Sequence, residues 1–456
     1  MKKYLSLALG LMLSAMACVS CQEENNEDTP EIPENAVEEP VTEIPFRELN
    51  ERDFSKINMN LRYSEGECPI EVTEKTLSNL DFGQKMSPCK AEEVRADYRP
   101  TDYDDPALDK EVIERYNKIC ETPSSGEISE YASSENAAFF EVNFDDYCGR
   151  HCSSLFAYDY DTDTLRELSS KEGLEEGKSY DYGSLYYAND MLICYNRETI
   201  NNHENQTTET ILHIMQIDTE TGKETEILSG DYDFIYSINH GKMILQTFVI
   251  GDEVKDISET GIILTEYDFS TGETRLISES DSFVNDMRVF FDDGSTGSIV
   301  RDEENDTVTF TTDDINLVTE HKKITDTFLW KDKAVVITND ALMYTDSYVM
   351  YTYDFDRMEC LISKLDGFGR NFAQMGEGLV ATSYGGWEGS KSPINYIAPE
   401  SGAVFRLAET NSGNINNVSD IFTFLERPAH TYDQYGMRVD DNNECKIYSF
   451  KLMHNS

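Results

Sequence analysis

Short runs of aromatic, aliphatic and β-branched residues, separated by polar turns, recur along the second two thirds of the chain. Residues 234–278 show the unit clearly, with apolar runs at 234–238, 242–250, 261–268 and 273–278. Ser270-Thr271-Gly272 joins the last two runs, and glycine suits a tight hairpin because it tolerates a positive φ. The pattern predicts four antiparallel strands, which we name A to D.

A short sequence motif recurs at the end of each predicted C strand, and in four of its seven copies an aspartate follows an aromatic or aliphatic residue. Successive copies of the motif are spaced by 59, 50, 43, 43, 44 and 51 residues. A strand unit repeated at about this period indicates radial or stacked repetition, and four strands per unit are typical of a β-propeller blade. The marker residues are Asp159, Asp218, Asp268, Thr311, Asp354, Ala398 and Ser449.

This pattern resembles the seven-bladed β-propellers found in bacterial surface lipoproteins and periplasmic propeller proteins. The resemblance covers about residues 135–456 and is one of pattern, because the Trp-Asp signature is missing and Gly385-Gly386 is a single kelch-like pair. It implies an all-β fold, a seven-bladed β-propeller over residues 135–456. Six or eight blades are the alternatives, because the fourth unit is irregular.

The ring needs an extra strand to close. The last unit reaches Ser456 with its C strand, and an open ring exposes unpaired backbone groups. We therefore expect the N-terminal extension, residues 46–134, to supply the missing outer strand, with 46–49 and 57–63 as candidates. The same extension should provide the A strand of the first unit and a short helix near 109–120.

The beginning of the chain predicts export. Two lysines precede an apolar stretch at 4–17, which is shorter than the roughly 20 residues of a membrane span and is typical of a secretory signal. Small residues then lead to Cys18 or Cys21, which resembles the lipobox of bacterial lipoproteins without its preferred leucine. We predict a lipoprotein-type signal peptide over 1–21, with Cys18 or Cys21 as the lipidated residue. A cleaved signal with free secretion is the alternative.

Residues 22–45 have the composition of a tether. They contain nine acidic residues, no Lys or Arg, and four prolines. Such a segment cannot bury enough apolar surface to offset its chain entropy, so we predict an extended, disordered linker. The expected location is the cell surface or another site outside the cytoplasmic membrane, where the chain is lipid-anchored.

The charge limits the partners. The chain has 88 acidic and 38 basic residues, a formal charge of −50. Phosphate backbones and anionic lipid surfaces repel such a protein, which excludes nucleic acid as a partner and leaves the N-terminal lipid as the membrane contact. The alternative use of the charge is attraction of cations or basic partners. We expect a monomer.

Eight cysteines follow the signal, and exported proteins can hold disulfides. The candidate local pairs are Cys68 with Cys89 and Cys148 with Cys152, although sequence alone does not fix pairing. A metal site around Cys148 and His151 is the competing interpretation. It lacks a second ligand pair at a zinc-like spacing, so no metal site is predicted.

Calcium is a weaker alternative for one turn. Asp159, Asp161 and Asp163 alternate like the start of a calcium loop, but Thr164 and Ser170 replace the expected Gly and Glu. The hairpin already accounts for these aspartates. We therefore predict no cofactor and keep calcium as the alternative.

The B–C loops predict the binding face. They are long and varied, at 197–208, 251–259, 339–347, 384–392 and 428–444, whereas the C–D links are short. Binding residues concentrate on loops held by a rigid scaffold, and aromatic rings stack on sugars or anchor protein contacts. The alternative is that these rings pack against adjacent loops. The predicted ligand-binding residues are Tyr384, Trp387, His430, Tyr432 and Tyr435.

Three functional classes follow. We favour a module that binds a protein or glycan, with a propeller-type polysaccharide lyase or hydrolase and a scaffold subunit of a cell-surface complex as alternatives. The seven histidines form no close ligand pair and no Gly-x-Ser-x-Gly elbow appears, so no catalytic residue is predicted. Converging histidines or paired carboxylates at the mouth of the central channel would favour an enzyme.

Overall fold

The computed structural model describes most of the chain after residue 45. The described residues are 46–85, 110, 114, 118, 126–145, 151–172, 184–188, 190–202, 207–239, 241–249, 261–280, 285–291, 293–302, 305–339, 348–382, 391–410, 416–418, 421–426, 431 and 442–453. Residues 46–456 belong to one compact unit. Within the described ranges, no helix combines the length and apolar character needed to cross a membrane. The predicted signal peptide and linker lie outside them.

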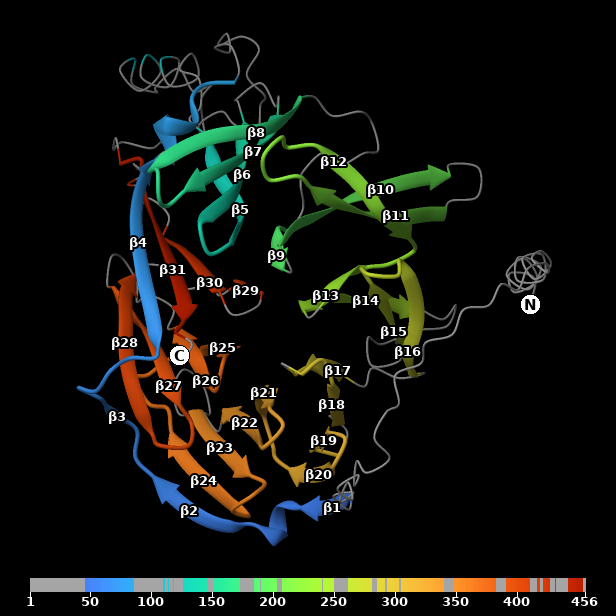
Figure 1. Ribbon diagram of the computed structural model, residues 1–456, viewed down its shortest axis with the longest axis vertical. Coiled ribbons are helices and arrows are strands. Elements are labelled where there is room, and N and C mark those ends of the chain that lie inside the picture. The colour runs from blue at the N-terminus through green and yellow to red at the C-terminus, as the bar shows by residue number, and fades with distance from the viewer. Residues whose placement is uncertain are drawn as a thin grey trace, which may run out of the picture. The chain divides into compact units, whose positions relative to one another are not determined.

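The described strands form seven sheets that are arranged as a ring (Figure 1). Blade 1 contains β5 (Glu127–Ser133), β6 (Ala137–Asp145), β7 (His151–Asp159) and β8 (Thr164–Glu172). Blade 2 contains β9 (Tyr186–Ala188), β10 (Met191–Asn202), β11 (Thr207–Ile217) and β12 (Glu224–Gly230). Blade 3 contains β13 (Phe234–Asn239), β14 (Lys242–Val249), β15 (Gly261–Asp268) and β16 (Glu273–Ser280).

The remaining blades continue in chain order. Blade 4 contains β17 (Asn285–Phe290), β18 (Thr296–Asp302), β19 (Thr307–Thr311) and β20 (Ile315–Glu320). Blade 5 contains β21 (Ile324–Leu329), β22 (Lys333–Asn339), β23 (Tyr348–Asp354) and β24 (Glu359–Lys364). Blade 6 contains β25 (Asn371–Met375), β26 (Gly378–Thr382), β27 (Ser392–Ala398) and β28 (Ala403–Thr410). Blade 7 contains β29 (Asn416–Val418), β30 (Ile421–Glu426) and β31 (Glu444–Leu452).

The predicted seven-bladed propeller is confirmed. Consecutive strands of each blade pair antiparallel in the order A to D, and the A strands lie toward the centre of the ring (Figure 1). The irregular fourth unit is a complete blade, and β5 is the A strand that blade 1 was expected to draw from the region before Ser134. Seven is therefore the blade number of the described chain.

The N-terminal extension closes the ring, but not with the candidate segments. β4 (Ile70–Ser78) pairs antiparallel with β31 along its whole length and is the missing D strand of blade 7. The candidates 46–49 and 57–63 were wrong, because they contribute strands that add to blades already complete. These are β1 (Arg47–Asn50), β2 (Ser55–Met59) and β3 (Arg62–Tyr63), each parallel to a D strand, β20, β24 and β28.

The extension therefore forms a belt, residues 46–85, that runs along the outside of blades 4, 5, 6 and 7 (Figure 1). It ends on blade 1 through η2 (Asn79–Phe82), a short 3-10 helix whose N-cap residue Ser78 forms a capping box with Asp81. The ring of Phe82 packs on Phe140 and Phe156 of blade 1. One continuous segment thus crosses the junction between the last blade and the first.

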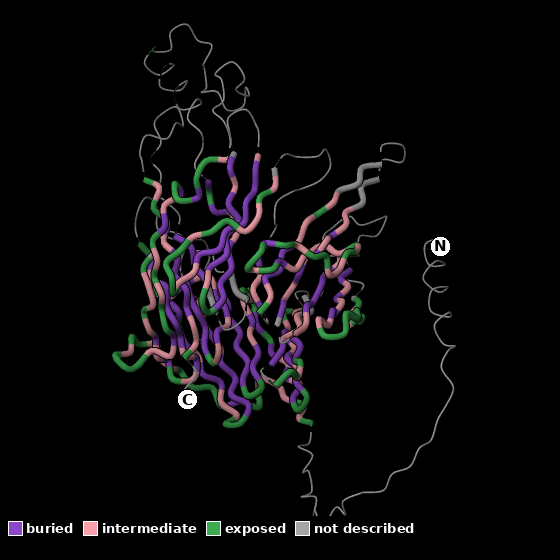
Figure 2. The backbone as a smooth tube through the Cα atoms, turned by 45° about the horizontal axis from the view of Figure 1, so that its top comes forward, coloured by how far each residue is buried: buried purple, intermediate pink, exposed green. Residues whose placement is uncertain are grey.

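The hydrophobic core lies between blades. Buried side chains form a separate cluster at each junction. Each blade is therefore stabilised by its contacts with the neighbouring blades, as in other repeat proteins. Figure 2 shows the buried stretches running through the sheets and the exposed ones at the turns. Contacting blades are represented by Leu155 and Leu192, Ile214 and Ile235, Leu264 and Phe290, Phe310 and Tyr353, Ile337 and Leu379, Ile394 and Phe424, and Ile447 and Phe140.

The repeated aspartate has a structural role in the C–D turn. Asp159, Asp218, Asp268 and Asp354 each accept hydrogen bonds from the backbone N–H groups two and three residues later. Backbone N–H groups lower the pKa of Asp159 and Asp218, and the Ser270 hydroxyl lowers that of Asp268. The aspartates therefore act as turn caps, as the hairpin interpretation expected.

The fourth residue after five of the seven markers adopts a positive φ. The backbone angles are 56° at Asp163, 68° at Gly222, 70° at Gly272, 53° at Met358 and 70° at Gly402. This conformation explains the recurrent glycine of the motif. In blade 4 the cap is Thr312, whose hydroxyl accepts from the N–H groups of Asp314 and Ile315, so the predicted marker Thr311 was one residue early.

Two other expectations fail. Cys68 and Cys152 are free thiols, so the local disulfide pairs were wrong. Cys152 instead packs as a small apolar side chain in the junction between blades 7 and 1. The predicted loop 197–208 is mostly strand, because β10 and β11 pair as far as Asn202 and Thr207. Its polar composition lacks the apolar alternation by which a strand is identified.

The helix expected near residues 109–120 is described at three positions. Lys110, Glu114 and Lys118 are helical, and the Lys110 ammonium lies 3.5 Å from the Glu114 carboxylate, four residues later. The spacing is that of neighbours on one helix face.

Candidate functional site

The five predicted ligand-binding residues lie outside the described residues. Tyr384 and Trp387 belong to the connection between β26 and β27, and His430, Tyr432 and Tyr435 to that between β30 and β31. These connections arise from neighbouring blades, 6 and 7, at the same face of the ring. The structure therefore fixes the ends of both loops without placing their side chains.

The bases of these two loops are linked. The Lys391 ammonium, just before β27, lies 3.9 Å from the Glu426 carboxylate at the end of β30. Glu426 is buried, and its other oxygen accepts a hydrogen bond of 3.3 Å from the hydroxyl of Tyr448. Burial, followed by the charge of Glu426, raises the pKa of Tyr448. This arrangement ties blade 6 to blade 7 directly beneath the predicted face.

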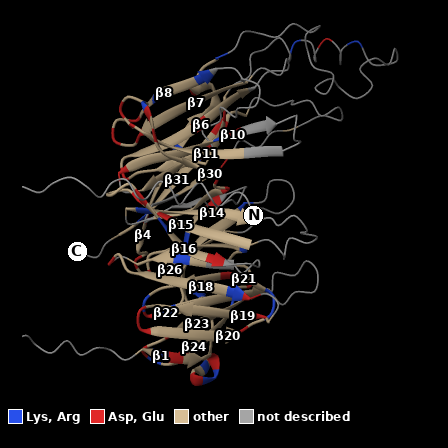
Figure 3. Cartoon of the chain, turned by 90° about the vertical axis from the view of Figure 1, so that its right-hand side faces the viewer, with Lys and Arg blue, Asp and Glu red and all other residues tan. Residues whose placement is uncertain are grey.

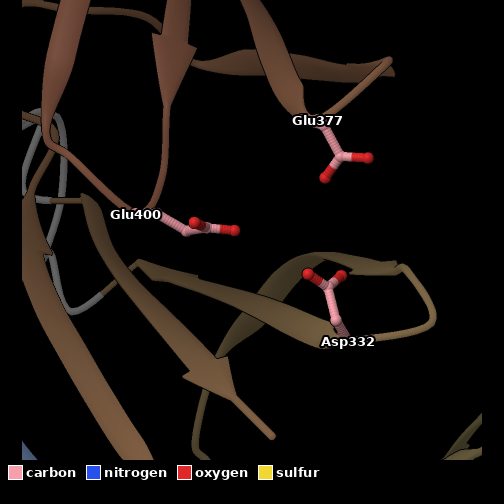
Figure 4. A group of neighbouring side chains, drawn as sticks. All are labelled: Asp332, Glu377 and Glu400. Atoms are coloured by element: carbon pink, nitrogen blue, oxygen red, sulfur yellow. The ribbon is translucent and has the colours of Figure 1, made fainter. Parts of the chain in front are cut away.

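A second candidate lies at the opposite face, where the A–B and C–D turns gather. Asp332 is in the A–B turn of blade 5, whereas Glu377 and Glu400 are in the A–B and C–D turns of blade 6. The three carboxylates converge, with an oxygen of each within 4.8 Å of the others (Figure 4). Figure 3 shows Asp and Glu positions at other turns on this side of the ring.

The ammonium of Lys333 occupies the centre of this group. It hydrogen-bonds to Glu377, lies 2.7 Å from Glu400, and lies 4.0 Å from Asp332. The Lys333 side chain is 2% exposed, whereas Glu377 is 73% and Glu400 38% exposed. Trp330 covers the ammonium from one side, with Nζ 5.2 Å from the ring centroid, a cation–π distance.

The electrostatics favour the charged lysine. Burial lowers the pKa of Lys333, but the hydrogen bonds to Glu377 and Glu400 outweigh it, and the net pKa is raised above 10.5. Burial also raises the pKa of Asp332, and Lys333 opposes that shift. Three carboxylates at this spacing have the oxygen chemistry of a cation site. Here the cation is the lysine itself, and the group joins blade 5 to blade 6.

We predict an asymmetric response at this cluster. Glu377→Gln combined with Glu400→Gln leaves the buried ammonium without its two charged partners, and should lower the free energy of unfolding by about 2 kcal/mol at pH 7, discounted for the exposure of the glutamates. Lys333→Met should cost less, because the exposed carboxylates can hydrate and the methionine chain still packs on Trp330. Urea unfolding measures both.

The pH dependence provides the check. In the wild type, the raised pKa of Lys333 adds stability that is present below pH 10.5 and is lost as pH rises through the folded value. In the double variant burial dominates and the pKa falls, so the deficit should shrink between pH 8 and 10. Lys331→Met is the matched control, because Lys331 is exposed and its pair with Asp293 should contribute little. An unchanged deficit at high pH contradicts the assignment.

This cluster could not be predicted from the sequence, because Asp332, Glu377 and Glu400 meet only after two blades pack together. Lys242 of blade 3, like Lys333, is the first residue of a B strand, and its ammonium lies 3.1 Å from the buried carboxylate of Glu266. A lysine at this position of the blade does not reveal in the sequence which of the many acidic residues it will contact.

The channel side of the ring contains a third feature. An open pocket lies against the inner strands of blades 4, 5 and 6, and none of its lining residues is ionisable. The histidines or paired carboxylates that would favour an enzyme do not line this pocket.

Comparisons with known proteins assign no function to the chain. No family model matches the chain, and no curated protein matches it. Several solved structures are similar at low identity. Oligogalacturonate lyase from Vibrio parahaemolyticus is 11% identical with a TM-score of 0.41, over 72% of this chain and 98% of that one.

Two further solved structures are similar at the same level of identity. The β-propeller domain of the Trilobed protease from Pyrococcus furiosus, described as having an open velcro topology, is 13% identical with a TM-score of 0.41, over 70% of this chain and 99% of that one. TolB from Acinetobacter baumannii is 11% identical with a TM-score of 0.34, over 75% and 98%. The chain is thus similar in outline to lyase, peptidase-domain and TolB structures, at a level that assigns no activity.

Proposed function

We propose that this chain is a lipid-anchored β-propeller outside the cytoplasmic membrane, and that it binds a protein or a carbohydrate through its B–C face. The observation that carries the proposal is the difference between the two faces of the ring. The C–D turns are short and capped by their own side chains, whereas the connections after β14, β22, β26 and β30 are long. A rigid ring that carries long loops on one face is a common binding scaffold.

Within that face, the junction of blades 6 and 7 is the proposed centre. Both aromatic-rich connections start there, and the contacts of Glu426 with Lys391 and Tyr448 join their bases. In this proposal, Tyr384 and Trp387 from one loop and His430, Tyr432 and Tyr435 from the other contribute to one binding surface. Tyrosine, tryptophan and histidine in such a surface suit a sugar ring or a protein hot spot.

The experiment uses the head, residues 46–456, which is one compact unit. The immobilised head is tested on a glycan array and by pull-down from an envelope extract. Trp387→Ala and Tyr384→Ala should each weaken capture of the recovered ligand at least tenfold. Tyr63→Ala is the matched control, since Tyr63 is 48% exposed on the outer edge of blade 6, away from the proposed face.

Capture that survives both loop substitutions, or that is lost equally in Tyr63→Ala, contradicts the proposed face. The anchor is tested separately on the full chain by metabolic labelling with an alkyne fatty acid. Labelling should disappear when Cys18 and Cys21 are both replaced by alanine. A labelled double variant, or an unlabelled wild type, contradicts the anchor.

A further inference from the structure

A pocket of about 270 Å³ opens on the inner side of blades 4, 5 and 6. Its walls come mainly from three A strands, β17, β21 and β25, which lie nearest the centre of the ring in Figure 1. The pocket therefore faces the central channel. The lining residues are Met287, Val289, Ile299, Thr327, Phe328, Phe372, Ala373 and Gln374.

The pocket exists because three blade junctions meet there. Ile299 belongs to the core between blades 4 and 5, Phe372 to that between blades 5 and 6, and Ala373 to that between blades 6 and 7. Met287 and Phe328 are only partly buried at the inner ends of these cores. An apolar molecule that covers them would remove further hydrophobic surface from water.

The pocket lining has two polar side chains, those of Thr327 and Gln374. The Thr327 hydroxyl accepts hydrogen bonds from Arg301, at 3.1 Å from Nε and 2.8 Å from Nη2, so the nearby guanidinium is already engaged. Gln374 adds an amide that already has a partner within the chain, but an amide has two donor and two acceptor positions, so it can also bond to a ligand. A charged ligand would lose its hydration without an opposite charge in the lining. A sugar would leave hydroxyls unpaired against Phe328, Phe372 and Val289.

The volume sets the size of the ligand. It exceeds the roughly 150 Å³ of an apolar cavity that binds benzene, and lies just below the roughly 300 Å³ at which drug-sized pockets begin. We propose that this pocket binds a small uncharged molecule made of one apolar six-membered ring with a polar substituent. The ring contacts Phe328, Phe372 and the Met287 sulfur, and the substituent bonds to Gln374. The site is separate from the B–C face and does not depend on it.

The test uses 4-fluorophenol as the probe, titrated into the 46–456 head and followed by fluorine NMR. The wild type should show saturable binding. Val289→Phe fills the pocket from β17 and should weaken the binding at least tenfold. Val249→Phe is the matched control, because Val249 is 44% exposed on β14 of blade 3, and it should leave the affinity unchanged.

The chemical class is tested by two more probes and one more variant. The anion 4-fluorobenzoate and 3-fluoroglucose should each bind at least tenfold more weakly than 4-fluorophenol. Gln374→Leu should weaken 4-fluorophenol about fivefold while retaining 4-fluorotoluene, which separates loss of the amide from loss of the fold. The proposal is overturned if 4-fluorophenol does not saturate, if Val289→Phe binds it like the wild type, or if the anion or the sugar binds best.

Discussion

Removal of residues 1–78 should abolish the cooperative unfolding transition, whereas removal of residues 1–45 should leave it unchanged. The longer deletion takes away β4, which pairs with β31 over nine residues and buries Ile70 and Leu77. It leaves Cys445, Ile447 and Phe450 of blade 7 uncovered, at about 2 kcal/mol for each large side chain. Calorimetry should therefore show no cooperative transition for the longer deletion and an unchanged midpoint for the shorter one.

Addition of the missing strand as a separate peptide tests whether the loss of the transition is due to the open ring. A peptide of residues 66–78 should bind the 79–456 chain, which retains η2, and should restore the transition because it brings back β4. The same peptide with Ile70→Ser and Leu77→Ser should fail, since both side chains are buried in the junctions on either side of blade 7. A cooperative transition in the longer deletion without any peptide would show that β4 does not close the ring.

Phe54→Ala should lower the free energy of unfolding by about 3 kcal/mol, at the low end of the cost of truncating a buried phenylalanine. Phe54 is 5% exposed and lies between η1 (Glu51–Asp53) and β2. Its ring packs edge-on against Tyr353 at 5.2 Å, and Tyr353 donates to or accepts from His321 at 2.7 Å. The side chain thus anchors the belt in the core of blades 4 and 5.

Phe46→Ala is the matched control, because Phe46 is 52% exposed at the start of the belt and its truncation should cost less than about 0.5 kcal/mol. Hydrogen exchange locates the effect. In Phe54→Ala the amides of β1 and β2 should lose protection before those of β22, because most β2 side chains are exposed and the strand can detach locally. Equal loss across blade 5, or equal effects of both substitutions, contradicts the anchor.

The ring itself was predictable because its repeat is local. Each unit carries its own strands and an aspartate that caps its own turn, as Asp218 does for the N–H groups of Glu220 and Thr221. The need for an extra strand also followed from the absence of a D strand after β31. The choice of β4 did not, because Ile57 and Tyr63 lie in an equally apolar segment that instead pairs with an exposed edge and remains largely exposed itself.

For the binding face, the sequence supplies only a location, and that location stays a prediction. Loop length and aromatic content pointed to the connections of blades 6 and 7, and the structure shows that their bases are joined through Glu426. The Lys333 group and the channel pocket were not predictable. Their members come from separate blades: Asp332 and Glu377 are 45 residues apart, and Met287 and Gln374 are 87 residues apart. Proximity of that kind exists only after the blades have packed.

The position of β4 also sets an order of events during synthesis and folding. Leu77 leaves the ribosome early, yet its pairing partner Cys445 lies 368 residues later, almost at the end of the chain. Contacts that distant in sequence form slowly and late. β4 therefore stays unpaired until β31 has been made, and an unpaired strand can aggregate with other chains. We expect folding to end with a cooperative step in which β4 and β31 pair, assisted by chaperones.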